Sequence, residues 1–155
     1  MTYDINANVD KFATAVGNGA TMGKLFREAV DYVIASRDTT VILRMMQRAV
    51  KRGDKGAANL VRSTFGSVFV GAKFTTKAGN VVGIKIKDAE LSNWAVDTLH
   101  MLTDDKASMR GKKWKDAFKT EKETPAFDLQ AFVARAMKAH PEVSKTAFAA
   151  AFQAA

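Results

Sequence analysis

Residues 67–87 read SVFVGAKFTTKAGNVVGIKIK, and this stretch decides the fold class of the chain. Segments 67–76 and 81–87 are rich in β-branched and aromatic residues, and the second ends with isoleucine and lysine in alternation. A period of two is typical of a half-buried strand. Because only residues 77–80, Lys-Ala-Gly-Asn, separate the segments, the sequence predicts an antiparallel hairpin with a four-residue loop.

The predicted hairpin has one apolar and one basic face. Ile84 and Ile86 should face the core, whereas Lys73, Lys85 and Lys87 should face water. A two-stranded hairpin is marginally stable alone in water, so it must pack against helices. Exposed lysines on a strand either protect the sheet edge from aggregation or contact a nucleic-acid backbone, and the sequence favours neither interpretation over the other.

On the N-terminal side of the hairpin, apolar residues recur at the 3.6-residue spacing of helices. Polar capping residues and glycines mark where these helices begin and end. The predicted helices are a short one ending at residues 17–19, one from Thr21 to Ser36, one from residues 38–40 to Gly53, and one from Asp54 to residues 65–66.

On the C-terminal side the helical spacing returns. Asp88 is the expected cap of a helix that ends at residues 104–105, and a short helix should follow over residues 108–119. The expected buried stripe of the first of these helices is Leu91, Trp94, Ala95, Leu99 and Leu102. The chain is therefore predicted to be α+β and mostly α, a helical domain with one small antiparallel hairpin at about residues 67–87.

Residues 120–124 are the best candidate for a linker, which divides the chain into a basic domain over residues 1–119 and a helical pair over residues 120–155. Thr124-Pro125 should begin the first helix of this pair, because proline is favoured at the first helical position. The pair is expected to pack on the same domain through its apolar residues, although such residues also suit docking on a partner or on a second copy. These residues are Phe127, Leu129, Phe132, Phe148 and Phe152.

The formal net charge of +8 over 155 residues is unevenly distributed. Residues 37–87 carry eleven Lys and Arg against two Asp, and residues 106–119 carry six against one. Between them, residues 88–105 hold five carboxylates and no Lys or Arg. A charge pattern of this kind bears on partners and not on fold, and two basic blocks favour a polyanionic partner.

The third predicted helix has a basic face. Arg44, Arg48 and Lys51 stand at i, i+4 and i+7, and the helix has no carboxylate after Asp38 to neutralise them. Arginine makes planar, bidentate contacts with phosphate. The candidate phosphate-binding residues of the first block are Arg37, Arg44, Arg48, Lys51, Arg52, Lys55, Arg62, Lys73, Lys85 and Lys87. An acidic protein partner, or plain solvation, would explain the same face.

A second candidate cluster comprises Arg110, Lys112, Lys113, Trp114 and Lys115. Basic residues around an aromatic ring are typical of single-stranded nucleic-acid sites, where the ring stacks on a base. The alternative is that Trp114 and Phe118, at i and i+4, anchor a helix in the core. In either case the charges would be exposed.

Other motifs are weak. Residues 51–54 have the length of a helix-turn-helix turn, but the helix after them has few side chains able to read bases. Asp97, His100 and Asp104 could approach one another on one helix as an acid–base or metal cluster, yet their spacing matches no metalloprotease motif. No nucleophile elbow, P-loop or dinucleotide fingerprint occurs. We therefore expect no catalytic residues, no cofactor and no metal.

These observations predict a non-enzymatic nucleic-acid-binding protein that contacts the phosphates of DNA or RNA through its Arg/Lys face. The alternatives are a protein-interaction module, an inhibitor or adaptor that docks its basic face on an acidic protein surface, and a self-assembling structural subunit that forms homo-oligomers. In composition the chain resembles small phage accessory proteins. The absence of cysteine, of a signal-peptide pattern and of an apolar stretch near ~18 residues predicts a cytoplasmic protein that does not enter a membrane.

Overall fold

A computed structural model describes residues 3–15, 17–119, 133, 137–138 and 146–147. The chain divides into two units, Met1–Lys119 and Thr120–Ala155. In the second unit the described residues are helical, namely Val133, Met137, Lys138, Thr146 and Ala147. The predicted linker at residues 120–124, the Thr124-Pro125 helix start and the C-terminal phenylalanines lie outside the described residues.

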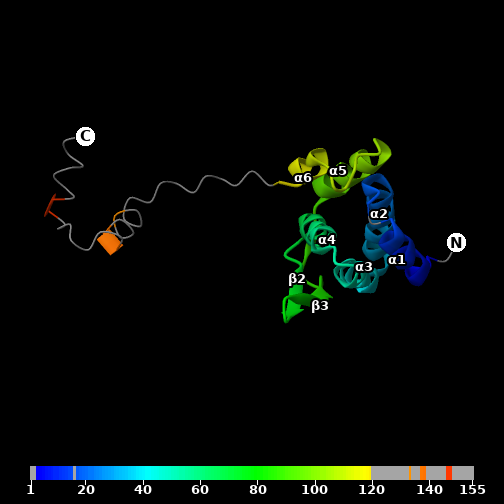
Figure 1. The fold of residues 1–155 in the computed structure, drawn as a ribbon, viewed down its shortest axis with the longest axis horizontal. Coiled ribbons are helices and arrows are strands. Elements are labelled where there is room, and N and C mark those ends of the chain that lie inside the picture. The colour runs from blue at the N-terminus through cyan, green and yellow to red at the C-terminus, as the bar shows by residue number, and fades with distance from the viewer. Residues whose placement is uncertain (1–2, 16, 120–132, 134–136, 139–145, 148–155) are drawn as a thin grey trace. The chain divides into compact units, whose positions relative to one another are not determined.

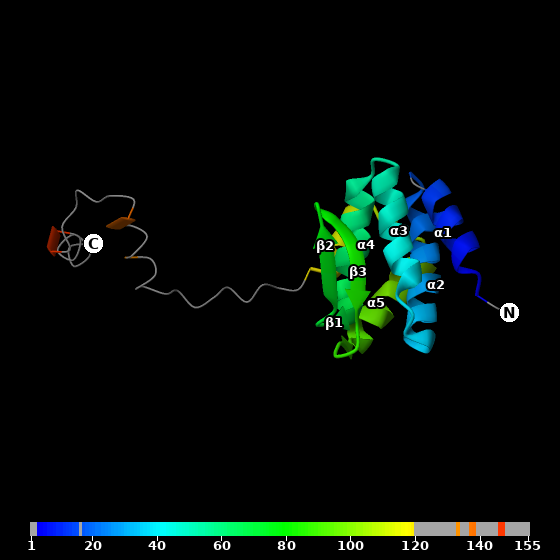
Figure 2. The same ribbon diagram turned by 90° about the horizontal axis from the view of Figure 1, so that it is seen from below.

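The first unit is mostly helical with two small antiparallel sheets, which confirms the predicted fold class (Figure 1). Its helices are α1 (Ile5–Thr14), α2 (Gly19–Ser36), α3 (Thr40–Lys51), α4 (Lys55–Val68), α5 (Asn93–Asp104) and α6 (Lys112–Ala117). Its strands are β1 (Phe69–Val70), β2 (Lys73–Lys77), β3 (Asn80–Lys85) and β4 (Glu90–Leu91). Figure 2 shows α1 to α4 side by side, with the β2–β3 hairpin along the outer side of α3 and α4. No helix among the described residues is long and apolar enough to cross a membrane.

Side-chain caps mark where α1, α2, α4 and α5 begin. Asp54 caps α4 as predicted, because its carboxylate accepts the Ala57 N–H at 2.8 Å. Two other predicted caps are wrong. Asn18 and not Thr21 caps α2, since the Asn18 carbonyl accepts the Thr21 N–H. Ser92 caps α5, whereas Asp88 lies in the segment that leads into β4.

The hairpin is shorter than predicted and has a tighter turn. Its loop is Ala78-Gly79 and not residues 77–80, because Lys77 and Asn80 still pair across the strands. Both loop residues have positive φ, 50° and 78°, as a two-residue hairpin turn of type I′ requires. Val82 has no partner in the register, so it forms a bulge that turns its side chain outward.

The predicted strand at residues 67–76 is divided between three elements. Ser67 and Val68 complete α4, and only residues 73–76 belong to the β2–β3 hairpin. Phe69 pairs with Leu91, and Val70 with Glu90, in the second sheet that the sequence did not predict. This pairing holds the start of the hairpin beside the start of α5.

Trp114 joins α6 to the rest of the core. Its ring is fully buried, and its indole N–H donates to the Thr64 hydroxyl of α4 at 3.3 Å. Gly23 of α2 makes room for it, because a Cβ at that position would lie 3.0 Å from the ring. The core interpretation of Trp114 is therefore confirmed.

The predicted buried stripe of α5 is only partly correct. Ala95, Leu99 and Leu102 are buried, but Leu91 is 36% exposed and Trp94 is 55% exposed. The reason is that the helix begins at Asn93, which leaves Leu91 in a strand and Trp94 in the first turn, away from α2 and α4.

Candidate nucleic-acid interface

Helix α3 separates an apolar from a basic face, as predicted. Val41, Ile42, Met45, Met46 and Ala49 are buried, while its Arg and Lys side chains are exposed. The helix packs against α1 on one side and against α4 and β3 on the other. Its basic face is therefore a ridge with a groove along each side.

Arg44 and Arg48 contact polar residues of another helix, which the sequence of α3 alone does not predict. Arg44 donates to the side-chain carbonyl of Asn6 at 2.6 Å, and the Arg48 guanidinium lies 3.3 Å from the Asp10 carboxylate. Both partners belong to α1. The Arg48–Asp10 pair is at the surface, where such pairs contribute about 0–1 kcal/mol, so Arg48 can exchange it for a phosphate.

The two aspartates of residues 37–87 both accept hydrogen bonds at the start of a helix, Asp38 beside α3 and Asp54 as the cap of α4. Asp38 accepts the Thr40 N–H at 2.9 Å, and hydrogen bonds from Thr40 together with Arg44 hold the pKa of this carboxyl below its usual range. Asp54 caps α4 and also forms an ion pair with Arg110. With eleven Lys and Arg against these two carboxylates, the block keeps a large excess of positive charge.

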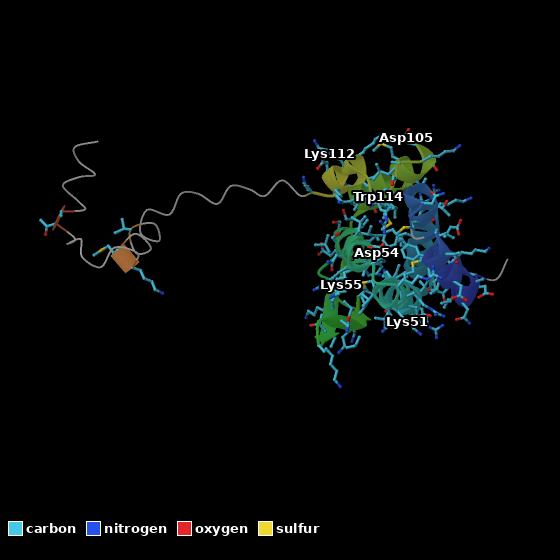
Figure 3. All side chains as sticks on the ribbon, in the orientation of Figure 1. Lys51, Asp54, Lys55, Asp105, Lys112 and Trp114 are labelled. Atoms are coloured by element: carbon cyan, nitrogen blue, oxygen red, sulfur yellow. The ribbon has the colours of Figure 1, made fainter. Side chains whose placement is uncertain are left out.

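The turn between α3 and α4 presents three exposed cations. Lys51, Arg52 and Lys55 have no ion-pair partner among the described residues. The Arg110–Asp54 ion pair brings the start of the second basic block to this turn. In Figure 3, Asp54 and Lys55 lie between Lys112 of α6 and Lys51 of α3.

The second predicted cluster is only partly available to a ligand. Trp114 is fully buried, so the predicted stacking of its ring on a base is wrong for this structure. Lys113 forms an ion pair with Asp105. Lys112 and Lys115 are exposed, and within the described part of the chain neither has an ion-pair partner. These charges can contribute to attraction but not to stacking.

The hairpin lysines are exposed as predicted. Lys73 and Lys85 lie directly opposite each other in the β2–β3 register, an arrangement of like charges that is destabilising unless an anion binds between them. Lys85 and Lys87 also line a shallow pocket of about 550 Å³ with Arg37, whose guanidinium lies 6.0 Å from the Phe69 ring centre. Of the residues that the structure describes, no carboxylate lines this pocket.

A groove of about 250 Å³ lies between α3, α4 and the start of β3. Its apolar walls are Met46, Val50, Ala58 and Val81, and its polar rim is Gln47, Lys51, Asn59, Arg62 and Asn80. Arg62 is held over the Phe74 ring, with 5.1 Å between the guanidinium carbon and the ring centre. Gln47, Asn59 and Asn80 were not predicted as site residues, because they come from three separate elements and share no motif.

The weak candidate cluster of Asp97, His100 and Asp104 on α5 is not grouped in the structure. His100 contacts Asp31 of α2 at 3.0 Å, and Asp104 contacts Arg27 at 2.6 Å. Within the described ranges, no three His, Cys, Asp or Glu side chains are grouped to hold a metal ion. The polar residues of α5 therefore tie that helix to α2.

Comparisons with models of protein families, with curated proteins and with solved structures find no match to this chain.

Proposed function

We propose that this protein binds nucleic acid, without catalysing a reaction, through exposed cations of the α3–α4 turn and the β2–β3 hairpin. The observation that carries the proposal is the charge of residues 37–87, where eleven Lys and Arg accompany two aspartates, one of which, Asp54, is engaged by Arg110. The cations around them thus have an excess of charge that a phosphate backbone can neutralise. The hairpin supports this reading, because an anion would relieve the repulsion between Lys73 and Lys85.

Charge reversal tests the proposal. We expect Lys51→Glu with Lys55→Glu to weaken binding to labelled DNA and RNA about tenfold or more, because two phosphate contacts are lost and a repulsive charge is added. Fluorescence anisotropy at low salt measures this. Lys11→Glu with Lys24→Glu is the matched control, since it changes net charge equally at two exposed positions outside the proposed surface.

Three results would count against this function. Equal losses in the two double variants would show that binding depends only on net charge. An absence of binding to single strands and duplexes alike would reject the proposal. Capture of an acidic protein that survives nuclease treatment and depends on Lys51 and Lys55 would assign the surface to a protein partner.

A second candidate function is self-assembly, and the exposed face of α5 favours it. Trp94 is 55% exposed and Met101 59% exposed on that helix, and Leu91 beside them is 36% exposed. Asp97 lies on the same helix and has no ion-pair partner in the described part of the chain. Tryptophan is enriched among residues that dominate interfaces. This acidic and apolar face is complementary in charge to the basic surface of a second copy.

Sedimentation measures whether such copies associate. We expect the mass to rise with concentration, and Trp94→Ala with Asp97→Lys to abolish the rise, because the change removes both the apolar anchor and the attractive charge. The Trp94→Ala, Asp97→Lys variant keeps its basic surface, and the Lys51→Glu, Lys55→Glu variant keeps its α5 face. A mixture of the two should therefore form dimers, but no larger assemblies. A constant monomer mass at all concentrations would contradict self-assembly.

A further inference from the structure

We propose that the groove between α3, α4 and β3 holds one unstacked base of a single-stranded nucleic acid. This inference rests on the proposed function and specifies the form of nucleic acid. The groove combines three features: a concave apolar floor, amide side chains at its rim, and cations beside them.

The floor suits a flat, weakly polar ring. Met46 and Ala58 are buried at its base, and Val50 and Val81 are half-buried at its sides. At about 250 Å³ the groove is smaller than the ~300–1,000 Å³ typical of sites for drug-sized ligands. It therefore has room for one ring of a ligand that continues outside it.

The polar side chains at the rim of the groove can form hydrogen bonds with the edge of a base. Asn59 and Asn80 are exposed, and neither side chain has a hydrogen-bond partner among the described residues. Gln47 makes only a long contact of 3.5 Å with the Val81 carbonyl. An amide side chain offers both donors and an acceptor, as the hydrogen-bonding edge of a base requires.

The charges at the rim suit the phosphates on either side of that base. Lys51 and Arg62 line the groove, and no carboxylate from the described part of the chain does. The contact of Arg62 with the Phe74 ring restrains its guanidinium before a ligand binds. An anionic chain with unstacked bases fits this arrangement. A duplex does not, because its bases are paired and stacked.

The test uses the full chain and a single strand of about ten nucleotides with 2-aminopurine at its centre. The fluorescence of this base rises when it leaves its stack, so binding by the parent protein should raise it. Gln47→Ala with Asn59→Ala should abolish the rise and weaken single-strand binding about tenfold, through the loss of two hydrogen bonds. Alanine is the better helix former at both positions and net charge is unchanged, so the variant should fold. Asn93→Ala, exposed on α5, is the matched control.

The outcomes separate the groove from the proposed function. If anisotropy reports binding while the 2-aminopurine fluorescence stays constant, no base enters the groove. The proposal for the groove is then wrong, whereas the proposed nucleic-acid binding stands. An equal rise with a duplex, or equal binding by the amide variant and the parent, would also reject it. An acidic peptide and an unlabelled strand can each be tested as competitors. If the peptide displaces the labelled strand at the lower concentration, the groove binds a protein segment instead. No anisotropy change with any nucleic acid would reject both proposals.

Discussion

At the scale of single residues, the two tryptophans show how far helical spacing determines burial. Trp94 and Trp114 both stand at the helical spacing that is typical of core residues. Trp114 has a partner for its indole N–H and a glycine that leaves space for its ring. Trp94 faces away from α2 and α4 and is 55% exposed. Spacing along one helix cannot reveal this difference, because it depends on what the neighbouring helices place opposite each side chain.

Trp114→Phe should destabilise the protein by about 1–3 kcal/mol, because the Thr64 hydroxyl, which is fully buried, loses the indole donor and the smaller ring leaves a cavity. Urea unfolding followed by circular dichroism measures the free energy. Trp94→Phe is the matched control and should change stability by no more than about 0.5 kcal/mol, as is usual for exposed positions. Equal costs for the two variants would contradict the environments described for these rings.

At the scale of elements, local signals predicted helices better than they predicted strands. Asp54 caps α4 as expected, since the cap and the N–H that it accepts lie three residues apart. The pairing of Phe69–Val70 with Glu90–Leu91 was missed, because a strand of two residues is too short to show a period. The same pairing explains why Asp88 does not begin α5: the chain must first complete β4.

The basic face of α3 was predicted from its own residues, but its partners were not. Asn6 and Asp10 are almost forty residues away from Arg44 and Arg48 in the sequence, and only the packing of α1 on α3 brings them together. The part of the candidate site that depends on one element was therefore accessible from the sequence. The groove, which needs α3, α4 and β3 together, was not.

Asp10→Asn should strengthen nucleic-acid binding about two- to fivefold, because it releases Arg48 and removes a negative charge from the edge of the basic face. Its stability should change by about 1 kcal/mol or less, since the ion pair is exposed. Anisotropy titration of the variant and the parent measures the change. Glu28→Gln, exposed on α2, makes the same charge change outside the surface, and an equal gain in both variants would show a general effect of net charge.

At the scale of the whole molecule, the fold neutralises some charges and leaves others free. Carboxylates from the acidic segment, residues 88–105, pair with Arg27 and Lys113. In the first basic block, Asp38 accepts the Thr40 N–H at the start of α3, and Asp54 caps α4 and also binds Arg110 from the second block. The two blocks are separate in the sequence, and this ion pair brings them together at the α3–α4 turn.

The salt dependence of binding measures how many of these charges contact phosphates. If about five phosphates of a single strand are neutralised, the logarithm of affinity should fall with the logarithm of salt concentration with a slope of about −3.5. Lys51→Glu with Lys55→Glu should bring the slope to about −2, because two of the contacts are lost. Gln47→Ala with Asn59→Ala should leave it near −3.5, roughly as in the parent, since hydrogen bonds to a base release no counterions. Anisotropy titrations at several salt concentrations give all three slopes. A slope near zero for the parent would exclude a phosphate-binding surface. A changed slope in the Gln47→Ala, Asn59→Ala variant would show that these amides contact the nucleic-acid backbone and not a base.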